Sequence, residues 1–379
     1  MKTKKADRIV LIVLLLSLIP FFIPEKAPVL TEGPTELRLI SLGIPYTEFE
    51  ARYPWDMRCY DGYLYLGAGD YNKNQAPNAL RRLSLKTYRW ETLNGFKDEH
   101  AERFLVLDGK LTIPGVDACE DWSLGNYYTI EKGALQAHRV LPNGIHNFDL
   151  AFLEGKTFAA LGTESPHSPL VVSEDAKTFV SVDFVTEEGK DLLSEDFYTA
   201  RIYDLFTLAG DLYAILSLCP TEQTLLRSIY RYEEDGKMHY FGKYPSLDSV
   251  SLHYFPIIAD VEKEDFLLFS TGRLYRTDDM QAFTDITPAD TRYIVDLAEA
   301  DGEIYALGSC IPQGESRFLN NLYRLEEDGS LSLVAFFRSS VPAMSFAVSG
   351  SSFFVSFGAQ GKDTTLLGEV FYAFLPPLP

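Results

Sequence analysis

The segment LAFLEGKTFAALG, residues 150–162, carries the pattern that decides the fold of this chain. Its two apolar runs flank a Glu-Gly pair, which favours a tight hairpin turn because glycine adopts a positive φ without strain. Six further segments share this design of an apolar run, a short polar turn and a second apolar run that ends in small residues. They are MRCYDGYLYLG (57–67), FLVLDGKLTIPG (104–115), LFTLAGDLYAILS (205–217), ADVEKEDFLLFS (259–270), LAEADGEIYALG (297–308) and SFAVSGSSFFVSFG (345–358).

The seven hairpins recur at a regular period of 37 to 55 residues between turns. A further strand rich in Tyr and Leu follows each hairpin, as in SIYRY (228–232), and six of these strands lead through a turn into a fourth strand. Such a period with four short strands per repeat is typical of the blades of a β-propeller. The sequence therefore predicts an all-β fold, a seven-bladed β-propeller of four-stranded blades over residues 36–375. The turns lie at Gly62, Gly109, Gly155, Gly210, Asp265, Gly302 and Gly350.

The last repeat lacks a fourth strand of its own. Its third strand, EVFYAF (369–374), runs into a proline-rich end, whereas LRLISLG (37–43) has strand character and no partner before the first repeat. We expect residues 37–43 to supply the outer strand of the last blade. This pairing would close the ring and remove an exposed sheet edge.

The N-terminal segment predicts export. Four basic residues within positions 2–8 precede an apolar run from Ile9 to Ile23, which is the composition of an export signal. We expect residues 1–30 to form an N-terminal hydrophobic helix, either an uncleaved signal-anchor or a cleaved signal peptide, since no clear small-x-small cleavage site decides between them. With the basic end inside, the propeller lies outside the cytoplasm. It is then held at the cell membrane through this segment only, or secreted.

The charge and the cysteines narrow the classes of partner. The net charge is −20, from 34 basic and 54 acidic residues, which argues against nucleic acid because phosphate binding needs Lys and Arg. The composition favours a soluble acidic domain, which we expect to be a monomer. Four cysteines lie far apart, so they show no zinc-binding spacing, and their three alternative disulfide pairings stay open.

Two turns resemble a known structural motif. SEDAKTF (173–179) and TDDMQAF (277–283) resemble degenerate Asp-boxes of the BNR, or sialidase-like, propellers, with Ser173, Asp175, Thr178 and Phe179 matching in the first copy and Thr277, Asp279 and Phe283 in the second. Both copies lack the usual Gly. The resemblance implies structural turns rather than catalytic residues. The wider repeat is also similar to the galactose oxidase central domain and the kelch class, although the double-Gly kelch signature is absent.

Acidic residues recur at one position of the repeat, six residues before each turn. The residues there are Asp56, Arg103, Asp149, Asp204, Ala259, Asp296 and Met344. Four Asp near the mouth of the central channel could form a ring that binds a hard cation or a polyhydroxyl ligand. Alternatively, each Asp accepts backbone N–H groups and pins its blade, and the repetition over several blades favours this structural interpretation.

The long polar loops of the first three repeats are the candidate binding face. They lie at residues 67–78, 114–126 and 162–169, and loops on a rigid scaffold commonly carry function. Innermost strands enter and second strands leave at the same end of a blade, so residues from these repeats should converge. The Asp-x-Asn-x-Asn run within 70–74 resembles half of a calcium loop but lacks its Gly and Glu, and ordinary Asx-turns explain it equally. The predicted ligand-binding residues are Asp70, Asn72, Arg103, Asp117, Trp122, His146 and Asp149.

Two classes of function remain from the sequence. We expect a binding or scaffold propeller that recognises a glycan or a surface protein on this face and is not an enzyme. The alternative is a carbohydrate-active hydrolase or lyase that uses acidic residues of the same face, since a glycosidase needs two placed carboxylates. No catalytic residue is assigned, no metal site is expected, no cofactor is implied, and calcium is open. For Arg103, the alternative to a ligand contact is an ion pair with Asp56 or Asp149 that locks adjacent blades.

Overall fold

The structure is a computed structural model that describes residues 33–69, 78–194, 197–221, 224–245, 257–359 and 363–376. The expected N-terminal helix within residues 1–30 lies outside these residues. Within them, the helical elements are two short 3-10 turns, η2 (Glu50–Arg52) and η3 (Leu192–Ser194). No helix in the described ranges is both long and apolar enough to span a bilayer. The remaining elements are β-strands.

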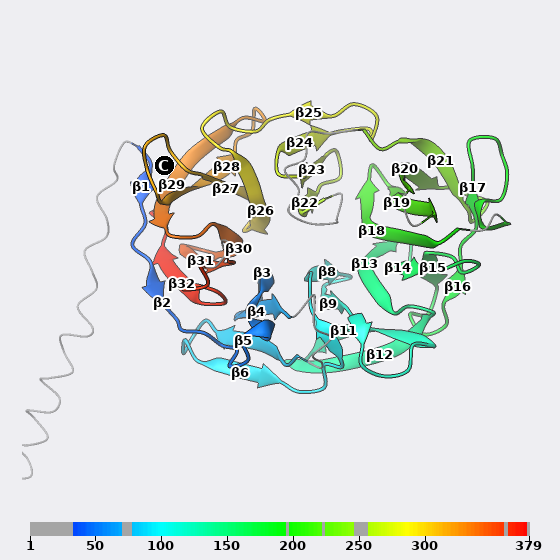
Figure 1. The fold of residues 1–379 in the computed structure, drawn as a ribbon, viewed down its shortest axis with the longest axis horizontal. Coiled ribbons are helices and arrows are strands. Elements are labelled where there is room, and N and C mark those ends of the chain that lie inside the picture. The colour runs from blue at the N-terminus through cyan, green and yellow to red at the C-terminus, as the bar shows by residue number, and fades with distance from the viewer. Residues whose placement is uncertain are drawn as a thin grey trace, which may run out of the picture.

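The strands form twisted sheets arranged in a ring around a common centre (Figure 1), so the fold is an all-β propeller. Five sheets are separate blades, and three of them are four-stranded antiparallel meanders. The first comprises β3 (Pro54–Tyr60), β4 (Tyr63–Ala68), β5 (Leu80–Ser84) and β6 (Trp90–Leu93). The second comprises β8 (Leu105–Leu107), β9 (Lys110–Pro114), β11 (Leu124–Glu131) and β12 (Ala134–Pro142). The third comprises β22 (Ala259–Glu262), β23 (Leu267–Ser270), β24 (Leu274–Thr277) and β25 (Thr284–Asp285).

The other two separate blades recruit strands from the start of the described chain. One contains β26 (Tyr293–Ala300), β27 (Glu303–Cys310), β28 (Phe318–Leu325) and β29 (Leu331–Ser339), and β1 (Thr35–Glu36) adds in parallel to its outer edge. The other contains β30 (Ala343–Ser349), β31 (Ser352–Phe357), β32 (Val370–Phe374) and β2 (Ile40–Ser41). Because β2 pairs antiparallel with β32, the expectation that residues 37–43 complete the last blade is confirmed.

The count of separate blades is five, not the expected seven, because the third and fourth repeats lie in one eleven-stranded sheet. The two meanders of this sheet are joined where Gly162 and Thr163 pair with Arg201 and Ala200. One meander comprises β13 (His146–Leu153), β14 (Lys156–Thr163), β15 (Leu170–Ser173) and β16 (Val180–Ser181). The other comprises β18 (Thr199–Leu208), β19 (Asp211–Thr221), β20 (Thr224–Tyr232) and β21 (Met238–Lys243). The remaining strands are β17 (Phe184–Val185), β7 (Asp98–His100) and β10 (Val116–Ala118).

The hydrophobic core lies between neighbouring repeats. For example, Leu64 and Leu66 of β4 pack against Phe354 of β31 and Val370 of β32, across the junction of the last and first repeats. Comparable buried clusters occupy each of the other junctions between consecutive repeats. The apolar faces of the strands are therefore buried by the next repeat around the ring, and burial of this apolar surface is the main stabilising contribution.

The two Asp-box-like turns have the same local geometry. Asp175 Oδ1 accepts the backbone N–H groups of Lys177 and Thr178, and Asp279 Oδ1 accepts those of Gln281 and Ala282. The carboxylates thus hold the turns between third and fourth strands, which is the structural role the resemblance implied.

The four cysteines, Cys59, Cys119, Cys219 and Cys310, all lie in the described part of the chain and form no disulfide there. Burial raises the pKa of Cys59 to about 12 and that of Cys119 to about 11, so both thiols are protonated at neutral pH.

Candidate functional site

A β-bulge interrupts the innermost strand at the recurrent Asp position. The strand register shifts between Pro54 and Asp56, between Asn147 and Asp149, and between Ile294 and Asp296. Bulges bend a strand and re-aim its side chains. These bulges place each Asp where it reaches the backbone of the next repeat.

Three of the four Asp pin the following repeat. Asp56 accepts the N–H of Phe104 at 2.6 Å, Asp149 that of Leu205 at 2.9 Å, and Asp296 that of Phe346 at 2.9 Å. In two of them the other carboxylate oxygen accepts the N–H of the next residue in the chain. These contacts favour the structural interpretation of the recurrent Asp over a ring that binds a cation.

Arg103 is the cation at the centre of this arrangement. Its guanidinium lies 2.7 Å from Asp149 Oδ2, 3.0 Å from Asp204 Oδ1 and 3.2 Å from Asp260 Oδ1. The partners come from β13, β18 and β22, so one side chain links four repeats. The contacts of Arg103 with Asp149 match the alternative in which Arg103 locks adjacent blades, and here Arg103 has three carboxyl partners rather than one.

Burial raises the pKa of several carboxyl groups around Arg103. The pKa rises to about 6 for Asp149 and to about 8 for Asp204, since burial outweighs the opposing charge of Arg103. Burial, reinforced by the charge of Asp260, raises the pKa of Glu262 to about 8 as well. Protons are therefore held in this cluster near neutral pH, which relieves repulsion among its carboxyl groups.

A second polar cluster forms where the short strands β7 and β10 extend the sheet beyond β13. β10 pairs with β7 on one side and with β13 on the other, where Val116 faces His146. Here His146 Nδ1 lies 2.7 Å from Asp117 Oδ1, and both side chains are partly exposed. Burial acts to raise the pKa of Asp117, but the hydrogen bond from His146 and the charges of His146, His100 and Arg201 hold it below its ordinary value.

Asp117 has a left-handed backbone conformation with φ of 58°. Few residues other than glycine adopt this conformation, although Asp tolerates it better than most. Asp117 is the middle residue of β10 (Val116–Ala118). The direction of its carboxylate therefore depends on this backbone conformation.

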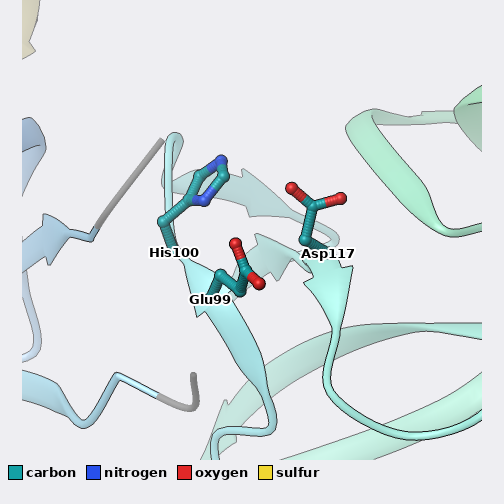
Figure 2. A group of neighbouring side chains, drawn as sticks. All are labelled: Glu99, His100 and Asp117. Carbon is teal, nitrogen blue, oxygen red and sulfur yellow. The ribbon is translucent and has the colours of Figure 1, made fainter. Parts of the chain in front are cut away.

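A second imidazole–carboxylate pair adjoins the first. His100 is almost fully buried, and its Nε2 lies 2.8 Å from Glu102 Oε1. Burial acts to lower the pKa of His100, but Glu102, Asp117 and Glu99 raise it overall. The ligand atoms of Glu99, His100 and Asp117 all lie within 4.8 Å of one another. Figure 2 shows the Glu99 carboxylate between the His100 imidazole and the Asp117 carboxylate in this view.

An aromatic layer connects His146 to the next repeat. The rings of His146 and Phe148 stack with centroids 5.6 Å apart, and Phe148 lies 4.5 Å from Tyr203. The hydroxyl of Tyr203 accepts a hydrogen bond from Arg201 at 3.1 Å. Gly162 pairs with His146 on one side and with Arg201 on the other, and a Cβ at this position would lie 3.1 Å from His146 and from Phe148. The glycine therefore permits this close packing.

The predicted site residues fall into separate groups. The structure brings together Asp117 with His146, and Arg103 with Asp149. Trp122 lies in the loop after β10, where its indole N–H donates to the carbonyl of Ala118 at 3.2 Å and 61% of its surface is exposed. Asp70 and Asn72 lie outside the described residues.

Glu99, His100 and Tyr203 were not predicted from the sequence. Glu99 and His100 belong to the polar run DEHAER (98–103), whose position just before an innermost strand was a usable signal, since this run also supplied Arg103. Tyr203 lies within a strand, where only its ring contact with Phe148 of the third repeat identifies it as a face residue.

No model of a known protein family matches the sequence, and no curated protein matches it. Among solved structures, the fold is similar to that of a streptogramin B lyase, with 11% identity and a TM-score of 0.53 over 91% of this chain and 100% of that chain. It is also similar to a polysaccharide lyase, an ulvan lyase bound to a GlcA(1-4)Rha3S segment, with 13% identity and a TM-score of 0.51 over 89% and 96%. The β-propeller domain of the trilobed protease from Pyrococcus furiosus shows 14% identity and a TM-score of 0.50 over 86% and 94%.

At these identities the likeness shows the fold alone. The class of protein is a β-propeller, and its structural neighbours include two lyases and a peptidase. Propellers carry many unrelated activities, so only the residues of the face can indicate the function.

Proposed function

We propose that this protein is a glycan-binding propeller whose binding face is centred on Asp117 and His146. The observation that carries the proposal is that this partly exposed imidazole–carboxylate pair lies beside the Arg201–Tyr203 pair, with the ring of Phe148 between them. Carboxylate, imidazole, guanidinium and phenol side chains supply donors and acceptors side by side. A ligand rich in hydroxyl groups satisfies such a set best.

Two features of the face support a carbohydrate over a flat protein partner. Hydrogen bonds to ionised groups are the stronger kind, and the face offers them from three consecutive repeats. Trp122 adds an exposed indole, an apolar plane with its polar N–H already bonded, which suits the face of a sugar ring.

Binding is tested with the purified full-length chain on an array of neutral and uronate-containing glycans. His146→Ala is the diagnostic variant, and His239→Ala is its matched control because His239 also forms an ion pair with a carboxylate, Asp235, but on the outer strand β21. We expect the first variant to lose at least about tenfold in affinity and the second to bind as the wild type does. Absence of glycan binding by the wild type, or equal loss in both variants, would refute the proposal.

Cleavage of the bound glycan is the second candidate function, favoured by the two imidazoles that each carry an orienting carboxylate at 2.7–2.8 Å. Such pairs are suited to general acid–base catalysis. For a uronate substrate, Arg201 would hold the carboxylate and His146 would take the proton at C5. The C4–O bond then breaks as the C4–C5 double bond forms, and Tyr203 gives its proton to the leaving oxygen. Burial is the main cause that keeps the pKa of Tyr203 above its ordinary value, so the phenol holds its proton at neutral pH.

Incubation of the protein with uronate polysaccharides separates binding from cleavage. Elimination produces an unsaturated uronate that absorbs in the ultraviolet, and hydrolysis produces new reducing ends without that absorbance. Binding of the polysaccharide without either product would support glycan binding alone. Loss of product in both His146→Ala and Tyr203→Phe, with the His239→Ala control active, supports elimination.

We also propose that the ring contains seven blades. Supporting this count, the meanders β13–β16 and β18–β21 each contain four consecutive antiparallel strands, and a buried cluster separates them as clusters separate the other repeats. The eleven-stranded sheet would then be two blades linked at one end by two residue pairs. An experimental structure with another number of blades would overturn the count.

The location outside the cytoplasm is a proposal that rests on the N-terminal sequence. The basic start and the apolar run from Ile9 to Ile23 favour export, with the propeller anchored or secreted. Protease added to intact cells should digest an anchored propeller, and secretion would place it in the medium. Protection of the chain in intact cells would reverse the proposed topology.

A further inference from the structure

We infer that Glu99, His100 and Asp117 form a binding site for a divalent transition-metal cation of the zinc class. Their ligand atoms lie within 4.8 Å of one another, Glu99 and His100 are buried, and Asp117 is partly open to solvent. Ligands about 2.1 Å from a tetrahedral zinc ion lie about 3.4 Å apart. Small rotations of these three side chains therefore suffice to enclose the cation.

Glu102 orients the imidazole of His100 so that it can bind a cation. Glu102 is held 2.8 Å from Nε2, and a carboxylate there accepts the proton of Nε2, which leaves the lone pair on Nδ1. Metal-binding histidines are commonly oriented by a carboxylate in this way. Glu102 is thus a positioning residue, and the cation would be held by one nitrogen and carboxylate oxygens.

The strand pairing explains why the two carboxylates meet. β7 and β10 are antiparallel, with Val116 opposite His100 and Ala118 opposite Asp98, so Glu99 and Asp117 lie opposite each other and share a face of the pair. One oxygen of Asp117 holds His146 at 2.7 Å, and the carboxylate has a second oxygen that can ligate the cation. Because Asp117 is partly exposed, the site is open to solvent on the side of this carboxylate.

The ligand types select the class of cation. Calcium and magnesium prefer sets made of oxygen ligands only, whereas imidazole suits zinc and its neighbours in the transition series. Three carboxyl groups, those of Glu99, Glu102 and Asp117, face the two imidazoles of His100 and His146 here, which favours a divalent cation. Three protein ligands also leave a coordination position open, as in zinc sites where a water or a substrate completes the shell.

The test uses the full-length chain, stripped with a chelator and titrated calorimetrically with zinc ion in the absence of any glycan. The outcome is therefore independent of the function proposed above. We expect one zinc ion per chain, at least about 100-fold weaker binding in Asp117→Asn and His100→Gln, and a 10- to 100-fold loss in Glu102→Gln. Asp121→Asn is the matched control, because Asp121 is an exposed carboxylate of the next loop bonded to Ser123 and Arg139, and it should bind zinc as the wild type does.

X-ray absorption of the zinc-loaded wild type makes the test independent of how the variants fold. We expect a shell of nitrogen and oxygen ligands that includes one imidazole. A sulfur ligand would overturn the inference, because it would move the ion to Cys119, whose thiol lies close to the carbonyl of Asp117. Absence of zinc binding by the wild type, unchanged affinity in Asp117→Asn, or equal loss in Asp121→Asn would also overturn it.

Discussion

Asp149 accepts the backbone N–H of Leu205, 56 residues further along the chain, at 2.9 Å with the same carboxylate oxygen that holds Arg103 at 2.7 Å. One oxygen atom thus fixes both a neighbouring strand and the central cation. Equivalent Asp–backbone contacts at Asp56 and Asp296 join other repeats. The inner end of the ring is therefore held by a polar network in addition to the apolar contacts between sheets.

Arg103→Ala should destabilise the fold by about 3–5 kcal/mol, because it leaves the carboxyl groups of Asp149 and Asp204 buried without their cation. Trp122→Ala, which removes an exposed side chain with one hydrogen bond, should cost about 1 kcal/mol or less. Chemical denaturation of both variants measures the difference. A normal denaturation midpoint in Arg103→Ala together with lost glycan binding would instead support a ligand-binding role for Arg103.

The free energy of unfolding should fall as the pH rises from about 5 to about 9. Burial, as the largest cause, raises the pKa of Asp204 and Glu262 to about 8 from ordinary values of 3.8 and 4.5. The folded chain then retains protons that the unfolded chain has released, so this stabilisation is complete below the ordinary values and is lost as the pH passes 8. The slope is up to about 1.4 kcal/mol per pH unit for each proton.

Denaturation midpoints across this interval measure that slope, and Glu262→Gln is the variant that checks its origin. The amide keeps an acceptor for Thr207, which donates its N–H and its hydroxyl to Glu262, but it cannot titrate. We expect a shallower slope in the variant. A wild-type midpoint that increases with pH, or an identical slope in the variant, would contradict the prediction.

Asp175→Asn should lower the melting temperature at neutral pH. Two backbone N–H groups, those of Thr178 and Lys177 in order of effect, and the hydroxyl of Ser173 hold the pKa of Asp175 at about 2. A lowered pKa contributes stability above the ordinary value, and this contribution is lost as the pH falls through about 2. The difference between variant and wild type should therefore shrink below pH 3.8, as followed by circular dichroism. If the difference in melting temperature stays constant down to pH values below 3.8, the charge of Asp175 does not contribute to stability.

Leu42→Pro should weaken the closure of the ring by about 1–3 kcal/mol. The N–H of Leu42 donates to the carbonyl of Val370 at 2.8 Å, beside the pairing of β2 with β32, and proline has no N–H to donate. Leu42→Val keeps the donor and serves as the control. Equal denaturation midpoints for the two variants would show that this backbone contact is not what matters at the closure.

The repeat itself was predictable because hairpins are local. In residues 150–162 the turn, the alternation of apolar runs and the small residues at the end are all within one short segment, and β13 and β14 pair there as expected. The same reasoning located the missing outer strand at residues 37–43, because an unpaired strand at one end and an incomplete repeat at the other have one simple solution.

The grouping of the face residues could be predicted only in part. Loop position alone brought Asp117 and His146 into one set, and the structure pairs them. The same set contained Arg103 and Asp149, which pair with each other, but the other two partners of Arg103, Asp204 and Asp260, belong to later repeats. Whether such a polar residue binds a ligand or links neighbouring blades depends on its neighbours across the ring. The spacing of residues along the chain does not specify these neighbours.

The sequence by itself determined the strand repeat, the closing strand and the acidic character of the chain, because each follows from local turn chemistry, apolar alternation or composition. Only the tertiary structure decided that the third and fourth repeats share a sheet, that Arg103 joins three carboxylates, and that Glu99, His100 and Asp117 meet. These outcomes depend on β-bulges and on the short pairing of β7 with β10. A shift of one residue in such a pairing turns every side chain to the other face, so these contacts are set by register in space rather than by pattern along the chain.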